Sequence, residues 1–348
     1  MFDDAKLEKI VKSLGYKNPE VFEKNQRISE LEFLFYQEAK LLFKNFKQYR
    51  SEKFELVLKT QIGQPIIFLV DFSHEGENTA RASKSKDNAG YALSVHYDIL
   101  QKISELINQV ATNEKIMRSI GFDDTDLYTV AKRDRVISTS EGESCSHFSH
   151  QKFVIRAIKT AFQFLLLHEF SHIFLGHVDC GKTLKFIEVV DEVKVHKIPN
   201  KTETDKISQG IEMHADLWAM IQILNPRYDV DRLASVALGL LTPLIIFRQI
   251  FELREHPISE NTNEHPALWF RGNQIMERLK LKENKINSKW YLLVYSLCQW
   301  HPIFGEYIGP ILQNDQYHSY LKQKAALTEK IRAVAEEIKA SAPSIVEV

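Results

Sequence analysis

The segment from Phe162 to Leu175 constrains the fold of this chain most strongly, because it is mostly apolar yet contains two histidines and a glutamate. It reads Phe-Gln-Phe-Leu-Leu-Leu-His-Glu-Phe-Ser-His-Ile-Phe-Leu. A helix that is hydrophobic on nearly every side is a buried helix. Polar groups inside such a helix need partners, since burial without one costs about 2–7 kcal/mol per group. The sequence therefore predicts a buried helix whose polar side chains are engaged.

These polar residues form the motif H-E-x-x-H, made by His168, Glu169 and His172. Residues four apart on an α-helix lie on one face, so both imidazoles project in the same direction. Two imidazoles at this spacing bind one zinc ion, and the glutamate then lies beside the open coordination position as a general base. We expect one Zn²⁺ per chain, although manganese, cobalt or iron would also suit such ligands. The alternative is a pair of core histidines that bond to neighbouring carbonyls.

A third metal ligand is expected from the segment Gly210–Ala219, which has the character of a packed helix. Glu212 and Asp216 lie four residues apart on one face of that helix. Glu212 is the predicted ligand, and Asp216 is predicted to accept a hydrogen bond from the far ring nitrogen of a ligating histidine. His214 points to the opposite side of the helix and is disfavoured as a ligand. Two further glutamates remain as outside candidates, Glu188 and Glu192.

The segment from His265 to Arg271 is a further candidate part of the site. Pro266 suits the first turn of a helix, with His265 beside its start. An imidazole there could donate a hydrogen bond to a developing oxyanion, and Arg271 could pair with a buried carboxylate. The His-Pro dipeptide also occurs at 256–257 and 301–302, so this interpretation depends on the other two motifs.

The residues that follow the first motif exclude a metzincin. That class needs glycine three residues after the second histidine and another histidine three residues later, where this chain has Leu175 and Val178. His177 is five residues from His172 and therefore lies on a different helix face. We expect His177 to be a polar residue near the helix end, with Gly176 allowing a close backbone contact.

In order, H-E-x-x-H at 168–172, E-x-x-A-D at 212–216 and H-P-x-x-x-x-R at 265–271 resemble the motifs of the gluzincin zinc metallopeptidases. The same order occurs in the membrane-bound CAAX-processing and HtpX-like peptidases, and its first two motifs occur in the ImmA/IrrE-type peptidases. The Gly176-His177 extension and the lack of a clear membrane span make the chain look most like the phage-exclusion Lit-type peptidases. This resemblance implies an intracellular endopeptidase that acts on a protein during phage infection.

The mechanism that the resemblance implies is hydrolysis of a peptide bond by a zinc-bound water, whose pKa the metal lowers toward about 7. Glu169 would take the proton of that water and deliver it to the leaving amine. His265 would stabilise the tetrahedral intermediate, and Asp216 would orient His168 or His172. Two alternatives stay open: a non-catalytic, zinc-stabilised regulatory or binding protein, and a membrane-associated gluzincin peptidase.

Composition narrows the class of protein. Lys+Arg is 45 and Asp+Glu is 46, so the chain lacks the basic bias of a nucleic-acid binder. Three widely separated cysteines suit a reducing compartment, and the first residues do not form a secretory signal. Both observations predict a cytoplasmic protein. Leu233–Phe247 is uncharged, but a membrane span takes about 20 apolar residues, so we expect a buried core helix and no integral span. The oligomeric state is left open.

The fold class expected from these patterns is α+β and mostly helical, with a zincin-like catalytic domain and a small sheet. The polar stretch 132–150 divides the chain into an N-terminal α+β module, 1–140, and a metallopeptidase domain, 150–345. Substrate recognition, an inhibitory cover and a plain structural layer are the alternatives for the N-terminal module. In the N-terminal half we expect a helix from a capping box at Ser29 to about Arg50, followed by strands at Phe54–Lys59 and Pro65–Phe72. A polar loop at Ala80–Gly90 and a helix at Tyr91–Val110 follow, and the first residues of that helix also fit a strand. In the second half, Leu184–Val195 is expected to be a strand or hairpin able to bind an extended substrate.

Overall fold

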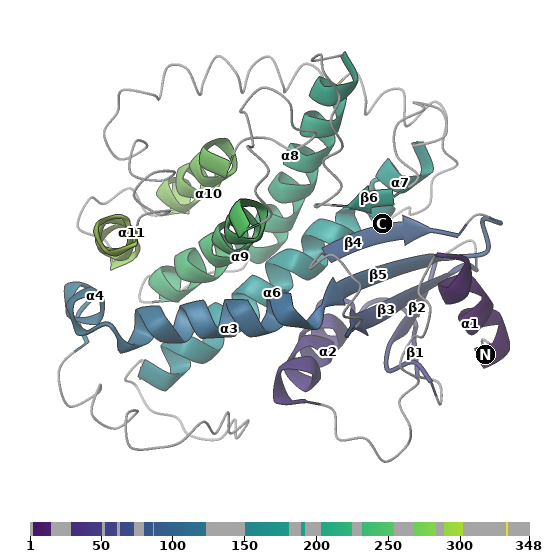
Figure 1. The fold of residues 1–348 in the computed structure, drawn as a ribbon, viewed down its shortest axis with the longest axis horizontal. Helices are drawn as coiled ribbons and strands as arrows, with labels where there is room; N and C mark the ends of the chain where they lie inside the picture. The colour runs from purple at the N-terminus through teal and green to yellow at the C-terminus, as the bar shows by residue number, and fades with distance from the viewer. Residues whose placement is uncertain are drawn as a thin grey trace.

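The structure of the protein is a computed structural model (Figure 1). It describes residues 3–14, 29–50, 53–60, 63–72, 80–85, 87–122, 150–180, 189–191, 203–224, 232–253, 268–282, 289–301 and 332.

Within the described residues, six strands form one mixed sheet of order β1-β2-β3-β5-β4-β6. The strands are β1 (Gln48–Tyr49), β2 (Val57–Lys59), β3 (Pro65–Asp71), β4 (Ala80–Lys84), β5 (Tyr91–His96) and β6 (Val189–Asp191). β3 and β5 pair in parallel, and the other neighbours pair antiparallel. β6 pairs with β4, although about a hundred residues separate them in the chain. The edge of the sheet is therefore made by a segment that follows the helix with the H-E-x-x-H motif.

Helices make up most of the described chain. They are α1 (Asp4–Ser13), α2 (Glu30–Leu42), α3 (Tyr97–Thr112), α4 (Glu114–Ser119), α6 (His150–Phe174), α7 (His177–Cys180), α8 (Glu203–Leu224), α9 (Leu233–Leu253), α10 (Leu268–Lys282) and α11 (Lys289–Trp300). α6 contacts α2, α3, α7, α8 and α9 as well as strands β4 and β5. This position explains why its sequence is apolar on almost every side. It also confirms the expected class, a mostly helical α+β fold with the H-E-x-x-H motif on a central helix and a small sheet.

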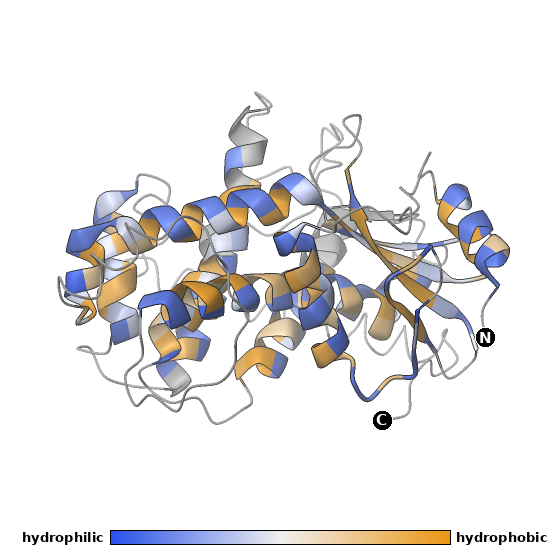
Figure 2. Ribbon diagram, turned by 90° about the horizontal axis from the view of Figure 1, so that it is seen from below, coloured by the Kyte–Doolittle hydropathy of each residue, from blue (hydrophilic) through white to orange (hydrophobic). Residues whose placement is uncertain are grey.

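The two faces of the sheet are covered by different helices. Residues of β2, β3 and β5 that point to one face pack on α1 through Leu7, Ile10 and Val11. The alternate residues of the same strands belong to the main core, which includes buried side chains of α2, α3, α6, α9 and α11. Figure 2 shows the sheet at one end of the molecule and most of the helices at the other. Because successive strand residues point to opposite faces, the same strands contribute side chains to both hydrophobic clusters.

Helices α6 and α9 approach each other closely at Gly239. A Cβ atom at that position would lie 2.5 Å from the carbonyl oxygen of Ala157 and 2.6 Å from Cβ of Thr160. Glycine is therefore needed for this helix contact. Among the described helices, α9 included, none combines the length and the apolar character that crossing a membrane requires.

Two sequence-based element predictions are wrong. The helix that begins after Ser29, whose side chain accepts a hydrogen bond from the Glu32 amide, ends at Leu42 and not at about Arg50. The chain then turns so that β1 can pair with β2. Ala80–Gly90 is not all loop, because Ala80–Lys84 forms β4, an inner strand of the sheet. Its polar residues lie between β5 and β6, where strand pairing overrides composition.

The remaining predictions concern two further segments and the division into domains. Tyr91–His96 is strand β5, the alternative that its first residues allowed, and α3 follows it directly. A short strand, β6, lies inside the predicted strand or hairpin at Leu184–Val195. The dividing stretch at 132–150 lies outside the described residues except for His150, and the two-domain division stays a prediction. The main core includes buried residues from both sides of that stretch.

Candidate metal centre

The candidate metal centre lies where α6 faces α8. His168 and His172 are one turn apart on α6, and Glu212 comes from α8. Their ligand atoms all lie within 4.8 Å of one another, and they are the only such His/Cys/Asp/Glu group in the part of the chain that the structure describes. All three side chains are buried, with relative exposures of 2% for His168, 0% for His172 and 3% for Glu212.

The separations of these atoms suit a tetrahedral cation. His168 Nε2 is 3.3 Å from His172 Nε2 and 3.2 Å from Glu212 Oε2, and His172 Nε2 is 3.5 Å from Glu212 Oε1. A tetrahedral zinc ion that binds nitrogen at about 2.0–2.1 Å holds its ligand atoms about 3.3–3.4 Å apart. Two imidazoles and one carboxylate also form the three-ligand set that leaves one position open for chemistry. The residues therefore fit a catalytic divalent metal ion.

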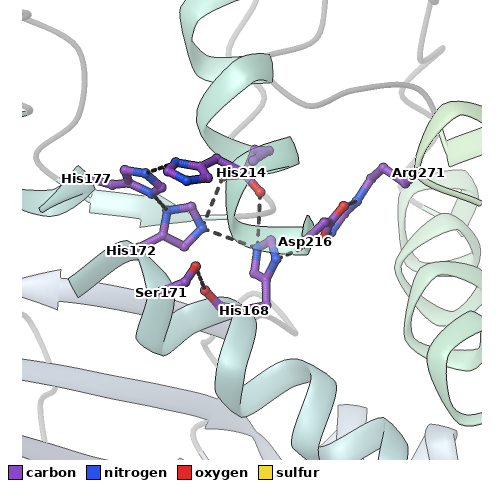
Figure 3. A network of polar contacts seen from close by, with 8 residues as sticks. His168, Ser171, His172, His177, His214, Asp216 and Arg271 are labelled. Atoms are coloured by element: carbon purple, nitrogen blue, oxygen red, sulfur yellow. Dashed lines mark hydrogen bonds and ion pairs between the residues drawn. The ribbon is translucent and has the colours of Figure 1, made fainter. Parts of the chain in front are cut away.

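Asp216 and Arg271 form a charged pair behind His168 (Figure 3). His168 Nδ1 lies 2.9 Å from Asp216 Oδ1, and Arg271 donates two hydrogen bonds to the same carboxylate, at 2.7 Å from Nε and 2.8 Å from an Nη atom. With Nδ1 turned to this carboxylate, the Nε2 lone pair of His168 faces the metal position.

Neighbouring charges shift the pKa values of both Asp216 and His168. Burial raises the pKa of Asp216, but Arg271 and His168 outweigh burial and hold that pKa below its usual range. Burial lowers the pKa of His168, but the carboxylates of Asp216 and Glu212 outweigh it and raise that pKa well above the usual range. The site therefore stabilises positive charge at the place where a cation would bind.

The comparison with known families agrees with this geometry. The sequence model of the family described as Peptidase U49 matches residues 136–293, which include α6, α8 and Arg271. Residues 136–293 of the chain are a Peptidase U49 domain. This domain is that of a metallopeptidase of the Lit type, as the resemblance in the sequence motifs predicts. No curated protein and no solved structure matches the chain.

The U49 site contains two more histidines than the sequence motifs indicate. His177 is fully buried, and its Nδ1 lies 3.1 Å from Nδ1 of His172. Its Nε2 lies 3.4 Å from Nδ1 of the half-buried His214 on α8. Burial lowers the pKa of both, well below the usual value for His177, where His172 and His214 act in the same direction. His177 is thus part of the site rather than a polar residue at a helix end.

The backbone after α6 explains how His177 reaches this position. Gly176 has a φ of 76°, a left-handed conformation that glycine adopts without strain. This turn ends α6 and begins α7 at His177, so that a residue five positions after His172 comes back to face it. Helical periodicity places His177 on another face, and only the glycine at the helix end gives a signal of the reversal.

The remaining predicted site residues have the following positions. Glu169 is buried on α6, next to His168. His265, Glu188 and Glu192 lie outside the described residues, so their predicted roles stay predictions. Arg271 lies in the first turn of α10, where the H-P-x-x-x-x-R motif ends.

Proposed function

We propose that this protein is a zinc-dependent endopeptidase that holds one Zn²⁺ with His168, His172 and Glu212. The observation that carries the proposal is the convergence of these three side chains, at tetrahedral spacing, inside a U49 domain. When bound, the zinc ion lowers the pKa of a water ligand and polarises the scissile carbonyl. A catalytic role is preferred over a structural zinc site, because structural sites are usually closed by four protein ligands and the described part of the chain contributes three.

The residues of the chain have separate tasks in this proposal. Glu169, which follows His168 on α6, takes a proton from the attacking water and passes it to the leaving amine. Asp216, held by Arg271, orients His168 through its Nδ1 atom. His265 donates a hydrogen bond to the oxyanion, as the H-P-x-x-x-x-R resemblance implies.

The proposed substrate is an extended segment of a protein. β6 is an edge strand of the described sheet, and it pairs with β4, which contacts both α6 and α7. An edge strand presents unpaired backbone groups to which an extended peptide can add. The sheet therefore offers a backbone-binding edge next to β4, a strand that contacts α6, the helix with His168 and His172.

The biological role that we propose follows from the Lit-type resemblance: a cytoplasmic peptidase that cleaves an intracellular protein and thereby excludes phage. Cells that express the wild-type chain should plate phage less efficiently than cells that express Glu169→Gln at the same level. Equal plating would remove the phage-exclusion role without affecting the peptidase proposal.

Metal content and hydrolysis test the peptidase proposal directly. Elemental analysis of the wild type should give about one zinc per chain, which His168→Ala and Glu212→Ala lose or bind far more weakly. Retention in Glu212→Ala alone would move the third ligand to another residue. A wild-type protein that binds no zinc after reconstitution would overturn the proposal.

Glu169→Gln separates catalysis from metal binding. We expect this variant to keep wild-type zinc content, because Glu169 is not in the ligand cluster, and to lose about 10²–10⁴-fold in kcat, the usual contribution of a general base. A digest of a peptide library, followed by rate measurement on a cleaved peptide, gives the comparison. Wild-type turnover in this variant would refute the assigned base.

A further inference from the structure

The two metal-facing histidines have different neighbours at their Nδ1 atoms. His168 has Asp216 at its Nδ1 atom, whereas the Nδ1 atom of His172 faces the Nδ1 atom of His177. His177 in turn faces His214, so three imidazoles lie in a row from α6 through α7 to α8 (Figure 3). His177 and His214, which the sequence motifs do not include, thus lie behind His172 as Asp216 and Arg271 lie behind His168.

The positions of the protons in this row follow from the metal ligand. If Nε2 of His172 offers its lone pair to a metal ion, the neutral ring carries its proton on Nδ1 and donates it to Nδ1 of His177. The neutral ring of His177 must then carry its own proton on Nε2, where Nδ1 of His214 accepts it. The opposite direction would put a proton on Nε2 of His172, between His168 and Glu212, where it would block the metal. One arrangement of the row is therefore compatible with metal binding.

Charged contacts hold the segment that carries His177. Two residues beyond it, Asp179 of α7 forms an ion pair with Lys84 of β4 and accepts a hydrogen bond from the Tyr91 hydroxyl of β5, at 3.1 Å. Together with the left-handed turn at Gly176, these contacts attach α7 to the sheet. His177 is thus fixed from both sides in the sequence, which suits a residue that has to orient another side chain.

We propose that His177 is a positioning residue for the zinc ligand His172, accepting the His172 Nδ1–H bond while His214 accepts the Nε2–H bond of His177. The proposal rests on the zinc site proposed above and extends it to the second histidine. If His177 served packing alone, zinc affinity would not depend on whether the atom of residue 177 that faces His172 is a hydrogen-bond acceptor. Partners of ligating histidines usually change metal affinity about 10- to 100-fold when they are removed.

Two variants of nearly equal shape separate the hydrogen bond from packing. Asn has an acceptor oxygen one bond from Cγ, as His177 has at Nδ1, whereas Leu has a methyl group there. We expect His177→Leu to weaken Zn²⁺ binding about 10- to 100-fold and to change the visible spectrum of the Co²⁺-substituted protein. His177→Asn should stay closer to wild type in both measurements. Zinc affinity is measured by competition with a chromophoric chelator, and urea unfolding of the metal-free proteins gives their folding stability.

The outcomes distinguish this proposal from the zinc site itself. Equal losses of affinity in the Leu and Asn variants, or wild-type affinity in His177→Leu, would overturn the positioning role and leave the zinc site standing. A wild-type protein without zinc affinity would overturn both proposals. His214→Leu keeps the His172 contact and should lower affinity by less than His177→Leu. If His177→Leu does not fold, His214→Leu still tests the row, because wild-type affinity there would overturn it.

Discussion

At the scale of single residues, each metal-facing histidine has a partner at its second ring nitrogen, and the two partners differ in charge. His168 faces the ionised Asp216, which Arg271 binds with two hydrogen bonds. His172 faces the neutral His177. A carboxylate increases the basicity of the imidazole that it contacts, whereas a neutral imidazole mainly orients its partner. We therefore expect the two ligands to respond differently when their partners are replaced.

Asp216→Asn tests the charged partner. Asn keeps the shape of Asp216 but removes the negative charge that pairs with buried Arg271 and faces His168. Removing one member of a buried pair costs about 3–5 kcal/mol of folding stability, and loss of a ligand's carboxylate partner weakens metal binding about 10- to 100-fold. Urea unfolding of the metal-free protein and zinc competition measure the two effects. Wild-type values in both would show that the pair supports neither the fold nor the ligand.

At the scale of elements, α6 is the central core helix and also carries the metal motif. The aromatic ring of Phe170 packs against Phe43, with 4.4 Å between ring centroids, while the neighbouring Glu169 and His168 belong to the site. Phe174 contacts Trp218 of α8, at 5.3 Å between centroids. The packing of α6 on α8 therefore determines the distance between the two histidines and Glu212.

Gly239→Ala tests the packing of α6 on α9. In an open helix this substitution stabilises by about 1 kcal/mol, but here the added methyl group would meet the backbone of Ala157 and the side chain of Thr160. We expect a loss of about 1–3 kcal/mol, as for other overpacked cores. Chemical unfolding of the metal-free variant gives the value. A variant with a higher free energy of unfolding than the wild type would contradict this prediction, because it would mean that α6 and α9 can move apart at no cost.

At the scale of the whole molecule, the site depends on segments far apart in the chain. β6, between α7 and α8 in sequence, completes a sheet whose other strands lie before residue 97. Asp179 of α7 reaches back to Lys84 and Tyr91 of that sheet. Metal binding is therefore expected to stabilise the whole fold and not one helix alone.

Zinc removal tests this coupling. A ligand that binds only the folded state stabilises it by about 2.7 kcal/mol at a free concentration of 100 Kd. We expect a chelator to lower Tm and zinc to restore it, because His168, His172 and Glu212 come together only in the folded protein. The His168→Ala variant is the matched control and should show little dependence on zinc. An equal response in both proteins would place the effect elsewhere.

Some parts of the fold and site could be predicted because their signals are local. The H-E-x-x-H motif lies on one continuous helix, and the capping box at Ser29 marks the start of α2. β4 could not be recognised in this way, since its polar sequence forms a strand only between β5 and β6. Periodicity predicts the wrong face for His177 for a similar reason, because it does not continue through the left-handed turn at Gly176.

The sequence alone determines the chemistry of this protein: two imidazoles on one helix face, a carboxylate pair on a second helix, and an apolar context that buries them. Only the tertiary structure decides which distant groups meet that chemistry. It brings Glu212 to the two histidines, Arg271 to Asp216, His177 to His172, and His214 to His177. The physical reason is that helix periodicity acts over a few residues, whereas the packing of α6, α7 and α8 depends on the whole core.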